Sequence, residues 1–238
     1  MLNKTKIVVT GGTGRFGQVL KESVGKNFIF PKKNQLNILK INSIVKYLKK
    51  MKPKYLVHLA GLSRPIEMHD NDIEKSINLN IIGTSNITVA CSKLNIKLIF
   101  FSTSYVYPGT KGNYKESDPL LPSSNYAWSK LGAEAAVKMY KNSLILRVSM
   151  TERPFVHKFA FADMKTNFIF HDEFVKIFKR IIRCKGVLNI GGPTKTVYNF
   201  AKKYNKNVKK KFLKKEKKIN LPIDASMSLD KLKKLLKK

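Results

Sequence analysis

Three polar side chains stand where they could hold and protonate an oxygen atom. Thr103 comes shortly after the apolar run 98–101, so it ends a predicted strand. Tyr126 and Lys130 stand four residues apart at the start of a predicted helix and therefore share one helix face. A lysine ammonium at this spacing lowers the pKa of a phenol from its usual value of about 10, which makes the phenol a usable general acid. Together the three residues predict protonation of a carbonyl or alkoxide oxygen.

The Tyr-x-x-x-Lys spacing is weak evidence by itself, because 9 tyrosines and 41 lysines in 238 residues produce such pairs by chance. The sequence holds three of them: Tyr107/Lys111, Tyr126/Lys130 and Tyr198/Lys202. The first pair straddles Pro108 and Gly109, which excludes a helix. The third lies beyond the last predicted core strand. The second begins an amphipathic helix, predicted over 126–141 behind the capping candidates 123–125.

Residues 10–17 form a glycine-rich turn that suits a phosphate. They directly follow a short apolar run that predicts a buried strand, and a helical pattern follows them. Gly12, Gly14 and Gly17 fit G-x-G-x-x-G. With Gly11 in place of Gly12, the wider G-x-x-G-x-x-G also fits. Glycines let the backbone turn tightly and let a pyrophosphate approach the helix N-terminus. This placement favours a dinucleotide site over a simple turn.

An absence of carboxylates indicates which dinucleotide is preferred. Sites for NAD usually carry Asp or Glu about 20 residues past the glycines, where it binds the ribose hydroxyls. Here no Asp or Glu occurs between Glu22 and Glu67. The cations Arg15, Lys32 and Lys33 would instead suit a 2′-phosphate, although lysines are common throughout the chain. We therefore expect NADP(H) to be preferred over NAD(H).

Strand and helix signals alternate along the chain. The predicted strands lie near 5–10, 27–30, 54–60, 97–103, 143–149 and 187–190. The predicted helices lie near 15–25, 41–50, 74–94, 126–141, 172–184, 197–204 and 228–236. This alternation predicts an α/β fold built on a Rossmann-like, doubly wound parallel sheet. Ligands of such sheets bind beyond the carboxyl ends of the strands, where Thr103 stands.

We expect two domains. Residues 1–150 would form the NAD(P)-binding Rossmann domain, and residues 151–238 a small C-terminal substrate-binding lobe. Within that lobe, a segment near 187–200 would return to the main sheet. The stretch 151–167, which holds Pro154 and many aromatic residues, interrupts the alternation. It is therefore the expected centre of the substrate lobe.

Five sequence landmarks resemble the extended short-chain dehydrogenase/reductases that act on nucleotide sugars. They are the loop 10–17, the segment 36–38 with Asn37 in place of the family's Asp, the strand end 58–61, the motif 80–84 and the dipeptide 146–147. The resemblance implies that Thr103, Tyr126 and Lys130 are catalytic. It also implies cofactor contacts along these landmarks and the Tyr/Lys pair, namely at Gly11, Gly14, Arg15, Phe16, Gly17, Asn37, Ile38, Leu59, Ala60, Gly61, Asn80, Tyr126 and Lys130.

Within that family the chain resembles the dTDP-4-dehydrorhamnose reductases. The similar segments are 102–107, with Ser104 where those enzymes have Asp, and 114–119, 189–193 and 226–229. The chain is shorter than a typical member, and the part after Arg147 is the least similar. We expect four residues to face the substrate: Ser104, Tyr105, Ser149 and Arg153.

The two residues after Thr103 bear on the type of reaction. Dehydratases of this family carry an Asp-Glu pair there, whereas this chain has Ser104 and Tyr105. Neither side chain is a useful base at neutral pH, which argues against dehydration. The resemblance therefore implies reduction of the 4-keto group of a nucleotide-linked 4-keto-6-deoxy sugar. NADPH would provide the hydride and Tyr126 the proton.

Two alternatives remain within the same fold. A nucleotide-sugar 4-epimerase needs no acid or base beyond these residues. A non-catalytic regulatory protein is the other alternative, because the regulatory subunit of methionine adenosyltransferase resembles the same reductases and a fold does not guarantee turnover. The intact Thr103, Tyr126 and Lys130 favour an enzyme.

The strong positive charge raises nucleic-acid binding as a third hypothesis. The net charge is +32 and the pI about 10.1, and residues 201–238 hold 15 lysines. However, 41 lysines stand against 6 arginines, and nucleic-acid recognition relies heavily on arginine. We therefore expect a lysine-coated surface and no nucleic-acid partner. Apolar spacing over 229–236 predicts that the basic tail folds as a helix.

Other features exclude further classes of protein. Cys91 and Cys184 are too few for a disulfide framework, no apolar run reaches the length of a membrane span, and no signal peptide precedes the first predicted strand. A cytoplasmic protein is therefore expected. The four histidines show no metal-ligand spacing, and we expect core or surface positions for all of them: His58, His69, His157 and His171. The expected partners are a nucleotide-sugar substrate and, at most, a second copy in a homodimer, with no membrane and no metal.

Overall fold

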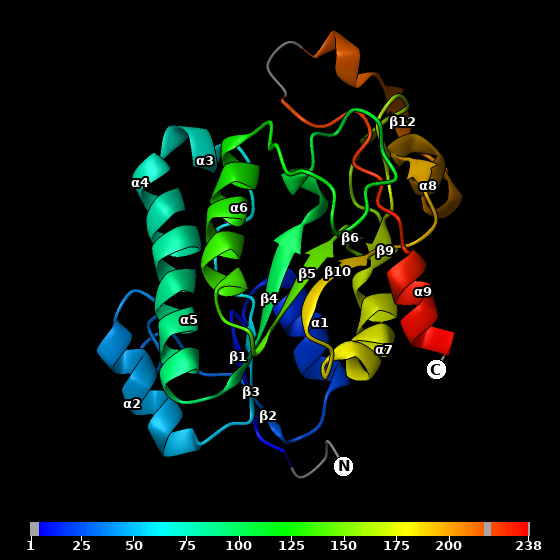
Figure 1. The fold of residues 1–238 in the computed structure, drawn as a ribbon. Coiled ribbons are helices and arrows are strands. Elements are labelled where there is room, and N and C mark those ends of the chain that lie inside the picture. Colours follow the sequence, from blue (N-terminus) through cyan, green and yellow to red (C-terminus); the bar gives the residue numbers. More distant parts are fainter. Residues whose placement is uncertain (1–4, 217–219, 238) are drawn as a thin grey trace. The chain divides into compact units, whose positions relative to one another are not determined.

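The computed structural model describes residues 5–216 and 220–237. Its central element is a six-stranded sheet in the order β10-β5-β4-β3-β1-β2 (Figure 1). The strands are β1 (Ile7–Thr10), β2 (Phe28–Ile29), β3 (Tyr55–His58), β4 (Lys97–Thr103), β5 (Ser143–Val148) and β10 (Gly186–Ile190). The pairs β1–β2, β1–β3 and β3–β4 are parallel. The predicted Rossmann-like α/β fold is therefore confirmed.

Burial explains why apolar runs form this sheet. Strands β1, β3 and β4 are buried along their whole lengths, as expected for parallel strands that are covered on both faces. Helix α1 (Arg15–Ser23) covers one face, and helices α2 (Ile41–Met51) and α5 (Gly83–Lys93) cover the other (Figure 1). In α2 the buried residues Ile44 and Leu48 lie one turn apart and give the helix its apolar side.

The chain forms two compact units, each assembled from separate parts of the sequence. Unit 1 comprises the residues up to 102 together with 129–145 and 182–186. Unit 2 comprises 103–128, 146–181 and the residues after 186. The domain boundary expected at residue 150 stays a prediction.

The helix predicted over 74–94 is confirmed in position but is not uniform. It runs as α4 (Ile73–Ser76), the π-helix η2 (Ile77–Ile82) and α5, and a short helix α3 (Met68–Asn71) precedes it. Helix α6 (Asn125–Lys138) begins as predicted and ends three residues early. Tyr140 follows its end, and the Tyr140 hydroxyl donates to the carbonyl of Ile96 at 3.1 Å. No helix of the described residues is both long and apolar enough to span a membrane.

Unit 2 contains strands that the sequence periodicity did not predict. They are β6 (Met150–Thr151), β7 (Phe159–Phe161), β8 (Lys165–Thr166), β9 (Ile169–Phe170), β11 (Lys195–Thr196) and β12 (Lys209–Lys211). They pair as β11–β8, β12–β7 and β6–β9, next to the short helices η3 (Ser104–Val106) and η4 (Leu213–Lys215). Aromatic side chains such as Phe155, Phe170 and Phe200 fill the core beneath them.

The helices of unit 2 agree with the sequence prediction. They are α7 (His171–Ile181), α8 (Val197–Tyr204) and α9 (Asp230–Lys237). Helix α9 buries Leu232, and the Leu236 carbonyl accepts a hydrogen bond from Arg180 Nη2 at 2.6 Å. Lys231 Nζ donates to the Val187 carbonyl, also at 2.6 Å. Helix α9 therefore packs within its own unit, and the helix predicted from the apolar spacing over 229–236 is confirmed.

Candidate active site

The glycine loop of unit 1 packs backbone against backbone. Gly11 has a φ of +75°, and a Cβ there would lie 2.5 Å from the Ala60 nitrogen. A Cβ on Gly17 would overlap the Gly11 carbonyl oxygen and lie 2.8 Å from Gly12 Cα. At Gly12, whose φ is not positive, the nearest atoms to an added Cβ belong to the Phe30 side chain and not to backbone. Of the two patterns left open by the sequence, the wider one with Gly11 is the one that the packing requires.

The loop leads into a helix N-terminus that is open to an anion. Gly14 is the N-cap of α1 and has no side chain to cap it, and the first turn of α1 holds no acidic residue. The Gly14 nitrogen donates to the Gly11 carbonyl at 3.0 Å, which closes the turn. Free N–H groups and the helix dipole at such an end favour phosphate. Phe16 and Gly17 of the same turn are buried, whereas Arg15 is exposed.

A buried histidine ties the ends of β1 and β3 together. His58 Nδ1 lies 2.7 Å from Thr10 Oγ1, and His58 Nε2 lies 3.1 Å from Thr84 Oγ1. The Ala60 nitrogen donates to Thr10 Oγ1 at 3.3 Å. Burial, with a smaller contribution from the charge of Lys130, lowers the pKa of His58 to about 3. Of the two positions expected for the histidines, core or surface, His58 takes the core, and its neutral imidazole fixes the strand ends that present residues 59–61.

Asn80 holds the loop after β3. Its side-chain oxygen accepts from the Leu62 nitrogen at 2.7 Å, and its Nδ2 donates to the Leu62 carbonyl at 2.9 Å and to Ser129 Oγ at 2.8 Å. Gly61 lies against this amide, since a Cβ there would come within 2.8 Å of Asn80 Oδ1. Asn80 lies in the π-helix η2, which is often a functional position. It positions residues 60–62 and α6, and its direct contact with a cofactor stays a prediction.

The predicted adenine-side segment is also held in place. Asn37 Oδ1 accepts from the Leu39 nitrogen at 3.0 Å, which makes a local turn. Asn86 Nδ2 donates to the Ile38 carbonyl at 3.0 Å, and the Ile38 side chain packs so closely on Gly83 that an added Cβ would lie 2.8 Å away. The first turn of α5 therefore holds residues 37–38 by packing and by a hydrogen bond.

Lys130 lies in an environment that lowers the pKa of its amine. Its amine lies 4.4 Å from the centre of the Phe100 ring, and the side chain is half-buried on α6. Burial lowers the pKa of Lys130 to about 8, against an opposing effect of Glu134. Tyr126 precedes it by one turn of the same helix, and its ring stands edge-on to Tyr105 with centroids 6.3 Å apart. A lysine with a pKa near neutrality is a frequent mark of a functional site.

The structure separates the three Tyr/Lys pairs more sharply than the sequence did. Tyr198 and Lys202 also lie on a helix, α8, so the helical spacing does not exclude them. However, Lys202 is exposed and donates to the Lys206 carbonyl at 2.6 Å. Tyr107 belongs to a buried structural network that is described below. Lys130 alone among the three lysines is desolvated.

Thr103, Ser104 and Tyr105 form a tight turn at the end of β4. Thr103 is buried, and its Oγ1 accepts from the Tyr105 nitrogen at 3.3 Å, so its hydroxyl proton stays available for a donor role. The hydroxyl of Ser104 is buried, and no hydrogen-bond partner for it is found among the described residues. The roles of Thr103, Ser104 and Tyr105 toward a substrate stay predictions.

The other two predicted substrate contacts have partners within unit 2. Ser149 Oγ lies 2.6 Å from Thr166 Oγ1 in the core. Arg153 Nη2 donates to Glu173 at 2.9 Å, and the guanidinium lies 3.9 Å above the centre of the Phe170 ring. Both side chains therefore have a structural task, and their contact with a substrate stays a prediction.

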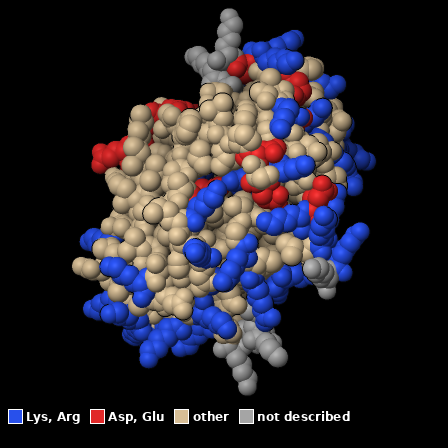
Figure 2. Space-filling view, viewed as in Figure 1, with Lys and Arg blue, Asp and Glu red and all other residues tan. Residues whose placement is uncertain are grey.

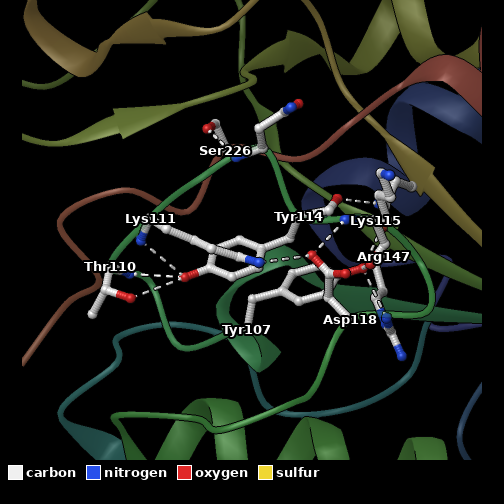
Figure 3. A network of polar contacts seen from close by, with 10 residues as sticks. Tyr107, Thr110, Lys111, Tyr114, Lys115, Asp118, Arg147 and Ser226 are labelled. Carbon is white, nitrogen blue, oxygen red and sulfur yellow. Dashed lines mark hydrogen bonds and ion pairs between the residues drawn. The ribbon is translucent and has the colours of Figure 1, made fainter.

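Unit 2 brings the remaining family landmarks together in one polar network (Figure 3). Buried Arg147 donates from Nη1 to the Tyr107 hydroxyl at 2.8 Å and to the Glu116 carbonyl at 3.1 Å. The Tyr107 hydroxyl donates in turn to Asn189 Oδ1 at 2.9 Å. Asn189 Nδ2 donates to the carbonyl of Tyr114 at 2.9 Å. Segments that are far apart in the sequence are therefore joined through side chains.

The same network contains two stacked tyrosines. The rings of Tyr107 and Tyr114 are nearly parallel, with centroids 4.8 Å apart, and Arg147 lies over Tyr107 (Figure 3). The backbone nitrogens of Thr110 and Lys111 donate to the Tyr114 hydroxyl at 2.9 and 3.2 Å. Burial raises the pKa of Tyr107, although Arg147 opposes the shift. These landmarks stabilise the segment between β4 and α6, the helix that carries Tyr126 in its first turn.

Sequence reasoning missed the side chains that support the site. Thr10, Thr84 and Ser129 were inside or next to recognised motifs, but nothing in their spacing indicated that they bind His58 and Asn80. A polar residue at the end of a fully apolar strand, such as Thr10, was the available signal. The described residues hold no group of three or more His, Cys, Asp or Glu side chains that could bind a metal.

Comparison with known families agrees with this geometry. Residues 5–163 match the family described as the RmlD substrate binding domain. The chain belongs to this family. The resemblance to extended short-chain dehydrogenase/reductases is thereby confirmed, because the match covers the glycine loop, the turn after β4 and α6.

Individual relatives are distant or match only in part. The beta subunit of methionine adenosyltransferase 2 from Pongo abelii is 30% identical over 142 residues, which cover 56% of this chain and only 42% of that protein. The structure of dTDP-4-dehydrorhamnose reductase from Bacillus anthracis str. Ames in complex with NADP gives a TM-score of 0.87 at 21% identity, over 97% of this chain and 92% of that one. UDP-glucose 4-epimerase from Thermus thermophilus, in complex with NAD, gives 0.77 at 16% identity, over 96% and 92%. At these identities the two structures establish the fold.

Proposed function

We propose that this chain is an NADP(H)-dependent reductase that acts on the 4-keto group of a nucleotide-linked 4-keto-6-deoxy sugar. The observation that carries the proposal is the environment of Lys130. Its amine is half-buried over Phe100, its pKa is lowered to about 8, and it lies one turn from Tyr126 on α6. An amine whose pKa lies close to neutral pH, one helical turn from a phenol, suits proton transfer at physiological pH.

The residues of unit 1 fit a dinucleotide. The open N-terminus of α1 would bind the pyrophosphate, and the exposed Arg15 would bind a 2′-phosphate. Residues 59–61, fixed by His58 and Asn80, would line the cofactor. When bound, NADPH supplies the hydride that reduces the sugar ketone at C4.

Three side chains would then complete the reaction. Thr103 would donate a hydrogen bond from its hydroxyl to the ketone oxygen and so orient the substrate, since its own oxygen already accepts from the Tyr105 nitrogen. Tyr126 gives its phenol proton to the alkoxide oxygen as the C4–H bond forms. Lys130 stabilises the phenolate through its charge, and the phenol regains a proton from solvent. Ser104, Tyr105, Ser149 and Arg153 are proposed to contact the sugar.

Two other functions are supported by the comparisons and remain alternatives. The likeness to a UDP-glucose 4-epimerase supports inversion at C4 with the same residues. The 30% identity to a methionine adenosyltransferase beta subunit supports a non-catalytic regulatory role. The cytoplasmic location, the homodimer and the absence of a nucleic-acid partner also stay predictions.

The test is a pair of matched substitutions, Tyr126→Phe and Tyr198→Phe, assayed with NADPH and a 4-keto-6-deoxy nucleotide sugar. Loss of the phenol proton in Tyr126→Phe should lower turnover by about 10²–10⁴-fold, with NADPH affinity within a few-fold of the parent. Tyr198→Phe should keep its activity, because Lys202 is exposed. The absorbance of NADPH and the NMR spectrum of the product are the measurements.

Each outcome has a clear reading. Inversion at C4 without net consumption of NADPH would indicate the epimerase. Binding of NADPH without turnover of any nucleotide sugar would indicate the regulatory protein. A larger loss in Tyr198→Phe than in Tyr126→Phe would show that the wrong Tyr/Lys pair had been chosen.

A further inference from the structure

Unit 1 contains a basic cavity at the edge of the sheet opposite to the glycine loop. Its volume is about 790 Å³, and all of its lining residues belong to unit 1. Four of them are cations, namely Lys54, Lys97, Arg183 and Lys185, and none of the lining residues is a carboxylate. We call this site the amino-edge cavity, because its residues precede or open the strands β3, β4 and β10.

The sheet itself brings these residues together. The strands are parallel, so their amino ends meet at one edge. The Lys97 nitrogen donates to the Lys54 carbonyl at 3.1 Å, and the Leu98 nitrogen donates to the Asn142 carbonyl at 3.1 Å. Asn142 also lines the cavity. The backbone positions are therefore fixed by the core and not by a mobile surface loop.

Lys97 distinguishes this cavity from an ordinary lysine-rich surface. The side chain is only 7% exposed, and its Nζ has no hydrogen-bond partner among the described residues. Burial lowers the pKa of Lys97, and the nearby charge of Lys185 acts in the same direction, while Cys184 opposes it. A buried amine without an acceptor is costly, and an anion in the cavity would provide the missing acceptor.

The surrounding surface has the same sign of charge. Figure 2 shows Lys and Arg side chains along the lower edge of the drawn face, on the side where β2 and β3 begin in Figure 1. Such a field attracts anions, but it is spread over the surface and does not select a site. In the amino-edge cavity, by contrast, three exposed cations lie around one buried amine, and this arrangement provides a specific binding site for an anion.

We propose that the amino-edge cavity binds a small molecule carrying a di- or triphosphate group. Several ammonium groups and one guanidinium fork match the oxygens of such a group, and a single phosphate would leave most of the volume unused. Thr5 lines the cavity before the amino end of β1, and the glycine loop begins at Gly11 beyond the carboxyl end of the same strand, about 20 Å away at roughly 3.3 Å per residue. The site is therefore separate from the cofactor loop and does not depend on the proposed function.

The test is a calorimetric titration of the full-length chain with pyrophosphate and with triphosphate, at constant ionic strength. Two cavity variants are compared with the parent, Lys97→Met and the double variant Arg183→Gln/Lys185→Gln. The matched control is Lys46→Gln/Lys50→Gln, which removes two exposed charges from α2. A further variant, Arg15→Gln, weakens the glycine loop.

Loss of charge-assisted hydrogen bonds should weaken binding at least tenfold in both cavity variants. The control pair and Arg15→Gln should stay within about threefold of the parent. Equal losses in the cavity and control variants would show non-specific attraction and overturn the proposal. Loss only in Arg15→Gln would place the anion at the glycine loop, and absence of binding to the parent would also overturn it. Circular dichroism confirms folding, and the double variant changes only exposed side chains.

Discussion

The two units hold their polar residues by different means. In unit 1 the candidate cofactor loop is set by backbone packing, since Gly11 lies on residues 59–60 and Gly17 lies on Gly11. In unit 2 the segments around the candidate substrate residues are joined by side chains, with Arg147 and Asn189 at the centre. Backbone packing tolerates no added atom, whereas a side-chain network tolerates added atoms better than the loss of a donor. Substitutions should therefore fail for different reasons in the two units.

The largest effect is expected from Gly17→Ala in unit 1. The added Cβ would overlap the carbonyl of Gly11, and neither backbone has room to move. We expect a loss of about 4 kcal/mol or more in the free energy of unfolding. NADPH affinity should fall at least 100-fold. Urea denaturation and fluorescence titration measure the two effects.

Gly25→Ala is the control for that prediction. An added Cβ at Gly25 would lie 3.3 Å from the side-chain oxygen of Asn27, so that a small shift of this amide, which donates to the Thr5 carbonyl, would accommodate it. Its cost should stay below about 1 kcal/mol. If the two variants were equally stable, the loop would not depend on backbone contact.

Arg147→Met tests the side-chain network of unit 2. The change keeps most of the volume but leaves the Tyr107 hydroxyl and the Glu116 carbonyl without their buried donor. We expect a loss of about 3 kcal/mol in the free energy of unfolding. Arg153→Met is the matched control, because the ion pair of Arg153 with Glu173 is partly exposed and should contribute about 1 kcal/mol or less. A smaller loss for Arg147 than for Arg153 would contradict the comparison.

His58, like Asn80, supports unit 1 through side-chain hydrogen bonds, and its effect should depend on pH. Its pKa falls from 6.5 to about 3 on folding, mainly because of burial. Below pH 6.5 the unfolded chain therefore binds a proton that the folded chain does not, so stability falls as the pH falls. We expect this residue to remove about 2 kcal/mol between pH 7 and pH 5.

Urea denaturation at the two pH values measures that loss. His58→Gln should reduce the difference between them, because glutamine does not titrate. The exposed His157 provides the control, and His157→Gln should leave the difference unchanged. The same pH dependence in the parent and in His58→Gln would remove His58 as its source.

The smallest effect concerns the choice of cofactor. The absence of Asp and Glu between Glu22 and Glu67, and the cations Arg15 and Lys32, predict that NADPH binds about tenfold more tightly than NADH. Arg15→Gln should reduce this ratio and leave NADH affinity nearly unchanged. Fluorescence titration with both cofactors measures it. An equal affinity of the parent for both would contradict the prediction.

The regular part of the fold could be predicted because each strand carries its own signal. Apolar runs such as 98–101 are buried on both faces, and the predicted strands of the main sheet are all present. The strands over 150–170 could not be predicted, because they are two or three residues long and exist only through their partners. β7, for example, pairs with β12, some 50 residues later.

The candidate site shows the same limit. The glycine loop and the Tyr126/Lys130 pair were visible as local patterns, but the desolvation of Lys130 depends on Phe100, which is 30 residues away in sequence. The burial of the Lys97 amine could not be predicted either, because a lysine that precedes an apolar run is typical of a solvent-exposed strand end. A single chain shows which residues are able to react. Only the fold shows which of them lose their water.

The π-helical stretch at Ile77–Ile82 joins α4 to α5 and changes the rotation of one helix relative to the other. An α-helix turns by about 100° for each residue, so one residue more or less rotates everything beyond it. The wider π turn absorbs such an offset and lets Asn80 reach Leu62 and Ser129 while α5 keeps its buried side on the sheet. A deletion of one residue here would preserve a regular helix but would direct the Asn80 amide away from Leu62 and Ser129. The length of this stretch is therefore as much a part of the site as its residues are.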